Sequence, residues 1–279
     1  MFYFCLFSAG ILASIIGALI GIGGGVIIVP FLVLFLGISM QKAIAISLAT
    51  IVLVSFITSI YNIKNHLVNI KLALILEIST ALCAIIASKI AIGINSNILK
   101  GIFGIFLFFV SFLILKPIHF RTKKIDGKMS YSYFDPDFKK VIYYKVRHLK
   151  IAILASSLAG IASGTLGIGG GVLKVPILNE ICQIPMRVST ATSNLMVGIT
   201  AFSAGFVYFN YGYLDMKFLQ WVILGTIIGS VIGIYIKRHL DNYSIKEIFS
   251  VIMLIVGIIM IIKSLSLFSI FGQAKLLKI

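Results

Sequence analysis

The chain has 279 residues, of which 60% are hydrophobic and only 11% are charged. This composition leaves too little polar surface to cover a water-soluble globule, so it excludes the ordinary soluble enzymes and indicates a membrane protein. The formal net charge of +16 does not indicate a nucleic-acid partner, because the basic residues are concentrated in one loop.

The first part of the chain predicts a long helix, a short segment led by glycines, and three further helices. We expect these elements over residues 2–20, 25–37, 42–62, 71–92 and 98–116. The long elements have about the 20 apolar residues that a helix needs to cross hydrocarbon. The first of them has no basic n-region and leads directly into the glycines, so we expect a retained helix rather than a secretory signal.

A basic segment follows. Between Lys116 and Lys150 lie ten basic and three acidic residues, a net charge of +7. Basic loops between spans stay on the cytoplasmic side, so residues 117–149 are predicted to form a cytoplasmic linker. We expect the linker to set the orientation of the protein and to contact anionic lipid headgroups; the alternative is a regulatory or ligand-binding role.

The remainder of the chain repeats the first part. Residues 21–30 read GIGGGVIIVP and residues 167–176 read GIGGGVLKVP, so eight of ten positions match at an offset of 146. The predicted elements here are 150–166, 171–184, 188–210, 217–238 and 246–268. The sequence therefore predicts an all-α polytopic membrane protein with two homologous repeats, 1–116 and 150–279. Each repeat has about four full helices and a short glycine-broken segment, which gives 8 to 10 hydrophobic segments.

The short segments leave the topology open. At a rise of 1.5 Å per residue they span only about 20 Å, less than the hydrocarbon core of about 30 Å. If each short segment crosses the membrane, each half has five crossings and the two halves are inverted; if it does not, each half has four and they are parallel.

Three consecutive glycines open each short segment: Gly23, Gly24 and Gly25 in the first half, and Gly169, Gly170 and Gly171 in the second. Glycine costs up to about 1 kcal/mol relative to alanine in a helix, so each run predicts a helix break inside the membrane. The new helix N-terminus carries free N–H groups and a partial positive charge, which attract an anion. The runs are therefore predicted to bind substrate. Close helix packing is the alternative, and it is the role that we expect for Gly225, Gly229 and Gly233.

Charged residues inside the apolar segments give a second indication. Lys174 and Glu180 replace Ile28 and Leu34 of the first half, and Glu77 lies about two turns inside its helix. Such residues usually face a cavity or a partner. We expect Lys174 to neutralise an anionic substrate, and Glu180 to carry a coupling proton or to pair with Lys174. Glu77 is a second candidate for the coupling role. The alternative is that Lys174 and Glu180 extend to an interface.

Polar residues begin the helix that follows each short segment. Ser47 lies there in the first half, and Ser193 and Asn194 lie there in the second. Hydroxyl and amide donors can replace water around an oxyanion without adding charge, so we predict that these side chains bind substrate. Helix capping and interhelical hydrogen bonding are the alternatives. The histidines have no metal-ligand spacing, and no HExxH, GxSxG or P-loop motif occurs, so we expect no catalytic residue, metal or cofactor.

Taken together, these motifs resemble a known family. Each GIGGGxxxVP motif is followed, 15 residues after its proline, by an Ala-x-Ser element, Ala45–Ser47 in one half and Ala191–Ser193 in the other. Twin motifs on a duplicated chain of this length resemble the TauE/SafE family of sulfite and organosulfonate exporters, also called the toluene sulfonate uptake permease family. The resemblance covers nearly the whole chain and implies a multi-pass permease of the bacterial inner membrane for sulfur-containing or carboxylate anions.

We therefore expect a secondary transporter of a small anion, with sulfite or an organosulfonate exported from the cytoplasm. Coupling to a proton or a sodium ion is a further expectation. The alternatives are an importer of a carboxylate or another oxyanion, and a membrane protein that handles a sulfur compound without transport. The residues leave the direction, the coupling ion and the oligomeric state open.

Overall fold

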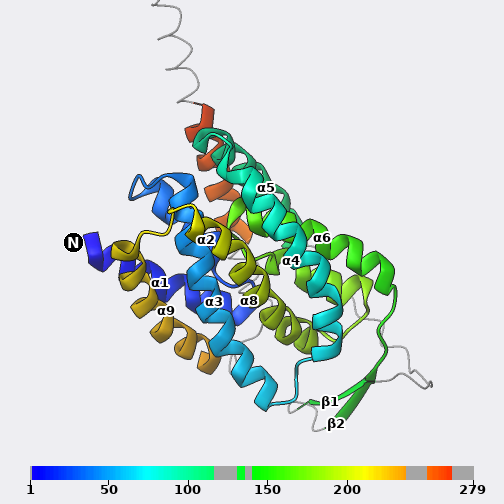
Figure 1. Ribbon diagram of the computed structural model, residues 1–279. Coiled ribbons are helices and arrows are strands. Elements are labelled where there is room, and N and C mark those ends of the chain that lie inside the picture. Colours follow the sequence, from blue (N-terminus) through cyan, green and yellow to red (C-terminus); the bar gives the residue numbers. More distant parts are fainter. Residues whose placement is uncertain (1, 116–130, 136–139, 237–249, 266–279) are drawn as a thin grey trace, which may run out of the picture.

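The computed structural model describes residues 2–115, 131–135, 140–236 and 250–265, and this part of the chain is mostly helical (Figure 1). The helices before the linker are α1 (Phe2–Ile20), α2 (Gly25–Leu34), α3 (Met40–Lys64), α4 (Ile70–Ile92) and α5 (Ser96–Leu115). Those after it are α6 (Leu149–Leu166), α7 (Gly171–Pro176), the π-helix η1 (Ile177–Ile181), α8 (Met186–Asn210) and α9 (Met216–Ile236). A further helix covers Ser250–Leu265.

These helices follow the predicted elements closely. Both α3 and α8 begin two residues before their predicted starts at 42 and 188, whereas α2 and η1 end at Leu34 and Ile181, before the predicted ends at 37 and 184. Of the predicted helix 246–268, residues 246–249 and 266–268 lie outside the described ranges.

Six of the described helices are long and apolar enough to cross a membrane: α1 from Tyr3, α3, α4, α6, α8 and α9. Shorter apolar helices cover Gly25–Leu34, Ser96–Phe112 and Ser250–Leu265. Helix α4 shows the character of the outer surface, because Ile78, Leu82, Ile86 and Ile90 form an exposed apolar stripe at a spacing of four residues. Such a stripe suits contact with lipid and would be unfavourable in water.

Helices α3 and α8 form the centre of the bundle. Helices α1 and α9 pack together on one side of this pair, and α4 and α6 pack together on the other (Figure 1). Glycines allow the outer pairs to approach closely: a Cβ at Gly225 or Gly229 would overlap backbone oxygens of α1, and one at Gly160 would overlap the Thr80 carbonyl of α4. These contacts confirm a packing role for Gly225 and Gly229. Each outer pair joins a helix that precedes the linker to one that follows it.

The contacts also fix the relative directions of the helices. Ser55 lies beside Gly198 and Leu48 lies beside Gly205, so α3 and α8 run antiparallel. In α1 and α9 the contact positions rise together, from Gly10 beside Val222 to Ile15 beside Gly233, so this pair runs parallel. The pair α4 and α6 also runs parallel, since Gly160 and Gly164 lie beside Thr80 and Ala84 in turn.

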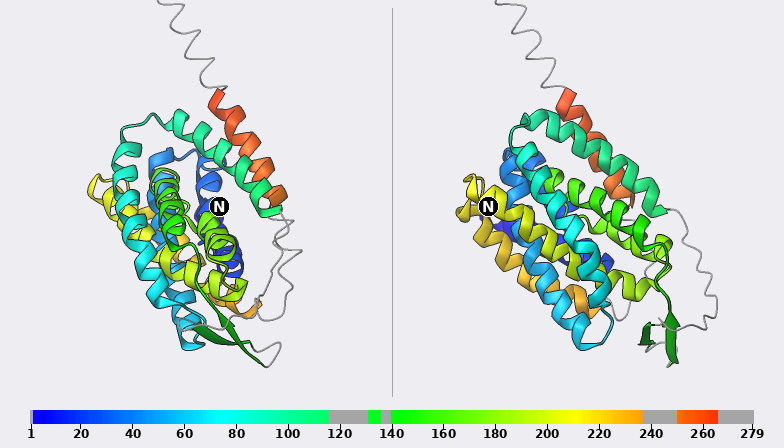
Figure 2. Two further views of the ribbon diagram at one scale, coloured as in Figure 1. Left: turned by 90° about the vertical axis from the view of Figure 1, so that its right-hand side faces the viewer. Right: turned by 45° about the vertical axis from the view of Figure 1, so that its right-hand side comes forward.

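The described part of the linker forms an unpredicted β-hairpin. Strands β1 (Tyr131–Asp135) and β2 (Lys140–Tyr144) pair antiparallel with Tyr131 opposite Tyr144. They lie beyond the helices, at the end where α3 finishes (Figure 2). The Asn69 amide donates a hydrogen bond of 3.3 Å to the Tyr144 hydroxyl, and the Arg147 N–H donates one of 3.1 Å to the Cys182 carbonyl.

The hairpin therefore packs on the start of α4 and the chain after η1. Burial raises the pKa of the Tyr144 phenol. Residues 116–130 and 136–139 of the linker lie outside the described ranges.

Candidate functional site

The site begins at two glycine turns between helices. Helix α1 ends at Ile20 and α2 begins at Gly25, while α6 ends at Leu166 and α7 begins at Gly171. The turns use left-handed backbone conformations, with φ of 83°, 86° and 81° at Gly21, Gly23 and Gly24, and 70°, 71° and 73° at Gly167, Gly169 and Gly170. Glycine adopts this conformation without the steric cost that other residues meet. The predicted helix breaks therefore lie at these glycines.

The two turns meet inside the bundle. The Ser47 hydroxyl donates a hydrogen bond of 2.7 Å to the Gly167 carbonyl, and the Ser193 hydroxyl donates a longer one of 3.4 Å to the Gly21 carbonyl. Each serine belongs to the half that does not contain its acceptor. The structure thus brings both predicted serines to the opposite glycine turn, and the members of the two hydrogen bonds are related by the same offset of 146 residues.

The meeting point is closely packed. A Cβ at Gly25 would lie 2.5 Å from the Gly167 oxygen, and one at Gly171 would lie 2.8 Å from the Gly21 oxygen. Gly24 and Gly170 instead face the preceding helices, because a Cβ there would lie 2.5 Å from the Ala13 oxygen and 2.8 Å from the Ala159 oxygen, respectively. Backbone of the other half therefore occupies the space next to Gly25 and Gly171.

Side chains close the same region further. A Cβ at Gly23 would lie 2.9 Å from methyl groups of both Ile51 and Val197, and one at Gly169 would lie 2.8 Å from Val197 and 3.0 Å from Ile51. Ile51 belongs to α3 and Val197 to α8, so the central helix pair covers both turns. All the predicted glycines thus lie at contacts that leave no room for a side chain.

Two helices begin in this region. The first bonds of α2 run from the Ile27 and Ile28 N–H groups to the Gly24 carbonyl, at 3.1 and 3.2 Å. The N–H groups of Gly25 and Val26 therefore fall outside the helical ladder, as they do at the start of any helix. Helix α7 starts in the same way from Gly170 but continues into the π-helix η1. Single-turn π-helices are frequent at functional sites.

Asn194 adds a buried donor without a partner. Its side-chain nitrogen is buried and has no hydrogen bond, while its side-chain oxygen lies 3.4 Å from the Cβ position of Gly21. The Ser55 hydroxyl donates to the Asn194 backbone carbonyl. An unsatisfied buried amide donor costs about 1–3 kcal/mol, and this one lies beside the glycine turns. In the first half Leu48 occupies the corresponding position.

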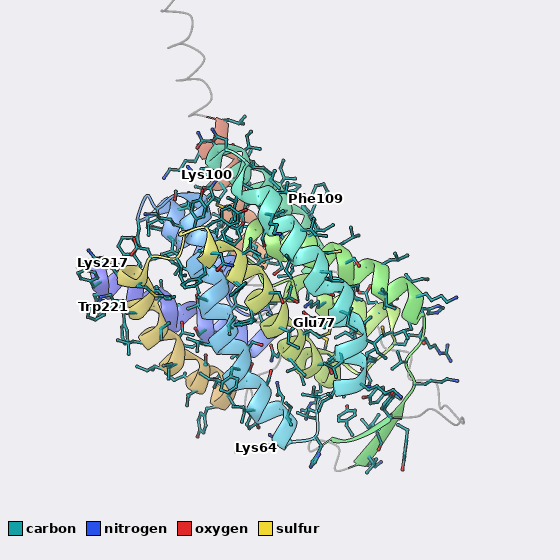
Figure 3. All side chains as sticks on the ribbon, in the orientation of Figure 1. Lys64, Glu77, Lys100, Phe109, Lys217 and Trp221 are labelled. Carbon is teal, nitrogen blue, oxygen red and sulfur yellow. The ribbon has the colours of Figure 1, made fainter. Side chains whose placement is uncertain are left out.

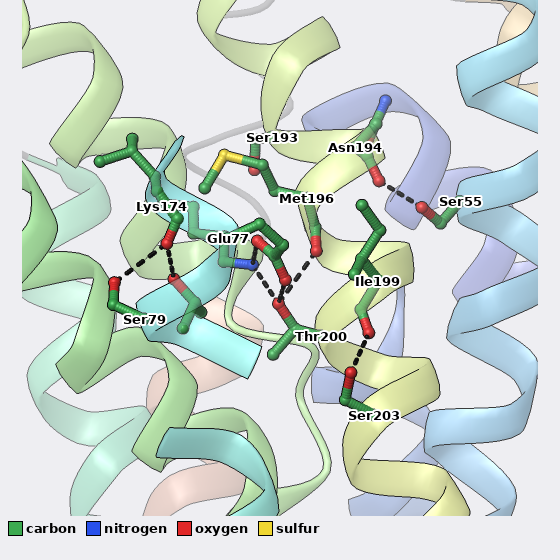
Figure 4. A network of polar contacts seen from close by, with 12 residues as sticks. Ser55, Glu77, Ser79, Lys174, Ser193, Asn194, Met196, Ile199, Thr200 and Ser203 are labelled. Carbon is green, nitrogen blue, oxygen red and sulfur yellow. Dashed lines mark hydrogen bonds and ion pairs between the residues drawn. The ribbon is translucent and has the colours of Figure 1, made fainter. Parts of the chain in front are cut away.

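The charged residues form one buried cluster. The Lys174 ammonium of α7 lies 3.0 Å from the Glu77 carboxylate of α4, and the Thr200 hydroxyl of α8 bonds to both groups (Figure 4). The Lys174 side chain is 0% exposed and that of Glu77 is 4% exposed. Figure 3 shows Glu77 within the bundle, whereas Lys64 lies at its end. The structure therefore excludes the alternative in which Lys174 extends to an interface.

The cluster has no polar counterpart at the positions related to it by the offset of 146 residues. The residues 146 positions away from Lys174, Glu77 and Thr200 are Ile28, Ile223 and Val54. Glu180 is exposed on η1 and makes no ion pair with Lys174. Its predicted coupling role remains a prediction.

Sequence reasoning missed Thr200, although it lies seven residues after Ser193 and therefore on the same face of the helix. Within the part of the chain that the structure describes, no group of three or more His, Cys, Asp or Glu side chains lies together to hold a metal ion.

The fold and the site define a polytopic helical membrane protein of the transporter class, in which two broken helices meet inside the bundle. The family described as "Sulfite exporter TauE/SafE" matches residues 6–260, so the chain belongs to the TauE/SafE family. Accordingly, this is a multi-pass membrane protein of a transporter family and not an enzyme.

Curated relatives resemble the chain over almost their whole length. The probable membrane transporter protein YunE of Bacillus subtilis is 26% identical over 264 residues, which cover 92% of this chain and 96% of the relative. A probable membrane transporter protein of Methanocaldococcus jannaschii is 28% identical over 273 residues, with 92% and 94% covered. One from Haemophilus influenzae is 26% identical over 291 residues, with 94% and 100% covered. No solved structure shows a significant match to the chain.

Proposed function

We propose that the protein is a secondary transporter of a small anion, and that it exports sulfite or an organosulfonate from the cytoplasm. The unpartnered Asn194 amide beside two facing helix N-termini is the observation that carries this proposal. These groups donate hydrogen bonds and together present a partial positive charge, which suits an oxyanion. The family description, which names a sulfite exporter, supports the choice of substrate.

The proposed substrate site lies where the glycine turns meet. Gly23 to Gly25 and Gly169 to Gly171 supply backbone N–H groups, and Asn194 supplies its amide. When the turns separate, the Ser47 and Ser193 hydroxyls donate hydrogen bonds to the anion instead of to the backbone carbonyls of the turns. Lys174 follows Gly171 by three residues, about one helical turn, and contributes positive charge to the same region.

We propose further that residues 1–116 and 150–279 are inverted repeats joined by the linker 117–149. The antiparallel packing of α3 and α8, which share the same bounds at an offset of 146, supports this arrangement. In such transporters, one repeat rocks against the other around a central site. The closed packing at Gly25 and Gly171 then corresponds to an occluded state between the two open ones.

The orientation follows from the positive-inside rule. The hairpin of the linker lies at the end where α3 finishes, and α8 starts at that end, since the Thr192 hydroxyl accepts a hydrogen bond from the Asn69 N–H. Helix α9 runs back toward the same end, and Lys237 and Arg238 follow it in the sequence. The basic residues of the linker and those that follow α9 support a cytoplasmic position for this end of the bundle in a bacterial inner membrane, next to anionic headgroups.

A substrate panel on purified, reconstituted protein tests the proposal. We expect saturable flux of sulfite or a sulfonate in proteoliposomes, and weaker flux of acetate. Asn194→Leu, which copies the residue of the other half, should raise the apparent KM by about tenfold or more, since the lost hydrogen bond goes to a charged acceptor. Asn65→Leu, at an exposed amide after α3, is the matched control. Binding without flux would favour a non-transporting protein, and flux of acetate alone would favour the carboxylate importer.

A further inference from the structure

The buried pair of Lys174 and Glu77 gives the proposed transporter a protonation site. The two charges lie 3.0 Å apart, and the Thr200 hydroxyl bonds to both. As long as Glu77 is ionised, the net charge of the pair is zero. A neutral pair has little attraction for an anion, so Lys174 serves as a counter-charge only when Glu77 no longer compensates it.

No second charge competes for Glu77 among the described residues of the helices around it. The other ionisable groups on these elements lie in the end turns of their helices or are exposed, and the Glu77 carboxylate pairs with Lys174. Helix α4 carries Lys71 and Lys89 at its ends, α6 carries Lys150 in its first turn, α8 carries Arg187 in its first turn, and η1 carries the exposed Glu180. The Tyr208 hydroxyl of α8 donates to the Gly164 carbonyl at 2.9 Å. Among the described groups, the protons of Glu77 and Lys174 therefore set the charge of the cluster.

We propose that Glu77 is the proton-coupling site of the transporter and that one proton enters it for each anion bound. The inference rests on the proposed function. A proton from solvent forms an O–H bond with the Glu77 carboxylate, which leaves Lys174 as a buried, unpaired cation. An unpaired buried charge is unfavourable, and an anion in the adjacent glycine turns relieves it. Proton and anion thus stabilise each other's binding, and the coupling is reciprocal.

This arrangement sets the stoichiometry and leaves the direction to the gradients. The anion and the proton leave together on the other side, where the O–H bond breaks and Glu77 pairs again with Lys174. With a monoanion the cycle moves no net charge. With a dianion it moves one negative charge, and an inside-negative membrane potential drives that charge outward, in agreement with export.

The pH dependence of binding tests the proposal. The probe is thiosulfate or a sulfonate, because neither changes its charge between pH 6 and 8. Its dissociation constant for detergent-solubilised protein should rise with pH, by up to about tenfold per pH unit where Glu77 is mostly ionised. In proteoliposomes with a trapped pH dye, entry of the anion should acidify the lumen.

Two variants assign the effect. Glu77→Gln copies the protonated carboxyl, so binding should become independent of pH and flux should no longer acidify the lumen. If this variant does not fold, the pH dependence of binding and the acidification of the lumen by the wild-type protein still decide whether a proton is coupled to the anion. Asp215→Asn is the matched control, since Asp215 lies 3.9 Å from Lys42 in a partly exposed ion pair away from Glu77, and its loss should leave the slope unchanged.

The outcomes separate this inference from the proposed function. Wild-type flux without acidification, or binding of equal strength at pH 6 and 8, overturns proton coupling at Glu77 and leaves the transporter standing. An unchanged slope in Glu77→Gln overturns the assignment to Glu77. Absence of binding and flux for every anion overturns the proposed function itself.

Discussion

The buried ion pair predicts a specific pattern of stability. Lys174→Ile alone leaves the Glu77 carboxylate without its partner in a fully buried position, 3.0 Å from where the ammonium lay. Removal of one member of a buried pair typically costs about 3–5 kcal/mol, whereas replacement of all charged members by apolar residues is often neutral or stabilising by about 1–4 kcal/mol. The triple variant Lys174→Ile, Glu77→Ile and Thr200→Val copies the residues found 146 positions away and should therefore be at least as stable as the wild type.

Unfolding in SDS mixed micelles measures this difference. The chain contains a single tryptophan, Trp221, whose fluorescence reports unfolding of α9. We expect Lys174→Ile to be less stable than the wild type by about 3–5 kcal/mol and the triple variant to recover that loss while it loses transport. A single variant as stable as the wild type would show that Lys174 and Glu77 are not paired in the interior, and the account of the cluster would fail.

Three further predictions follow from contacts at the glycine turns and at the linker. Gly25→Ala should destabilise the fold by about 1–3 kcal/mol, because its Cβ would lie 2.5 Å from the Gly167 oxygen. The control Gly93→Ala should change stability little, because the atom closest to its Cβ lies 3.6 Å away. Equal effects of the two substitutions would refute the close packing at Gly25. Ser47→Ala should cost about 1–3 kcal/mol and more than Ser193→Ala, since the Ser47 bond is 2.7 Å and the Ser193 bond 3.4 Å; the reverse order in thermal unfolding would contradict this. A cysteine at the exposed Ser132 in a cysteine-free variant should react with an impermeant thiol reagent only after cell permeabilisation, and labelling of intact cells would place the linker outside.

The sequence predicted the helices well because their apolar runs are long and the glycines interrupt them sharply. The β-hairpin was missed because each strand has only five residues, and both lie within a segment dominated by its basic charge. Such short strands gain most of their stability from packing, in this case of Tyr133 and Tyr144 in one buried cluster with Leu72 and Cys182.

Sequence reasoning singled out Lys174, Glu77 and the glycines, but it missed Thr200 and the pairings of these residues. Glu180 was the partner proposed for Lys174, and only three-dimensional contacts show that Glu77, 97 residues away, is the partner. Glu180 follows Lys174 by six positions, which places it about 240° round a regular helix and therefore toward another face. The relative direction of the halves was likewise beyond the sequence, since it depends on which residues of α3 meet α8.

Anomalous diffraction tests directly whether an anion binds where the two glycine turns meet. Selenite is a heavier analogue of sulfite with the same pyramidal geometry, and its selenium atom can be located unambiguously in crystals of the protein. We expect an anomalous peak within hydrogen-bond distance of the Asn194 amide, between Gly25 and Gly171. Saturable selenite transport with a peak elsewhere in the bundle, or none at this position, would contradict it.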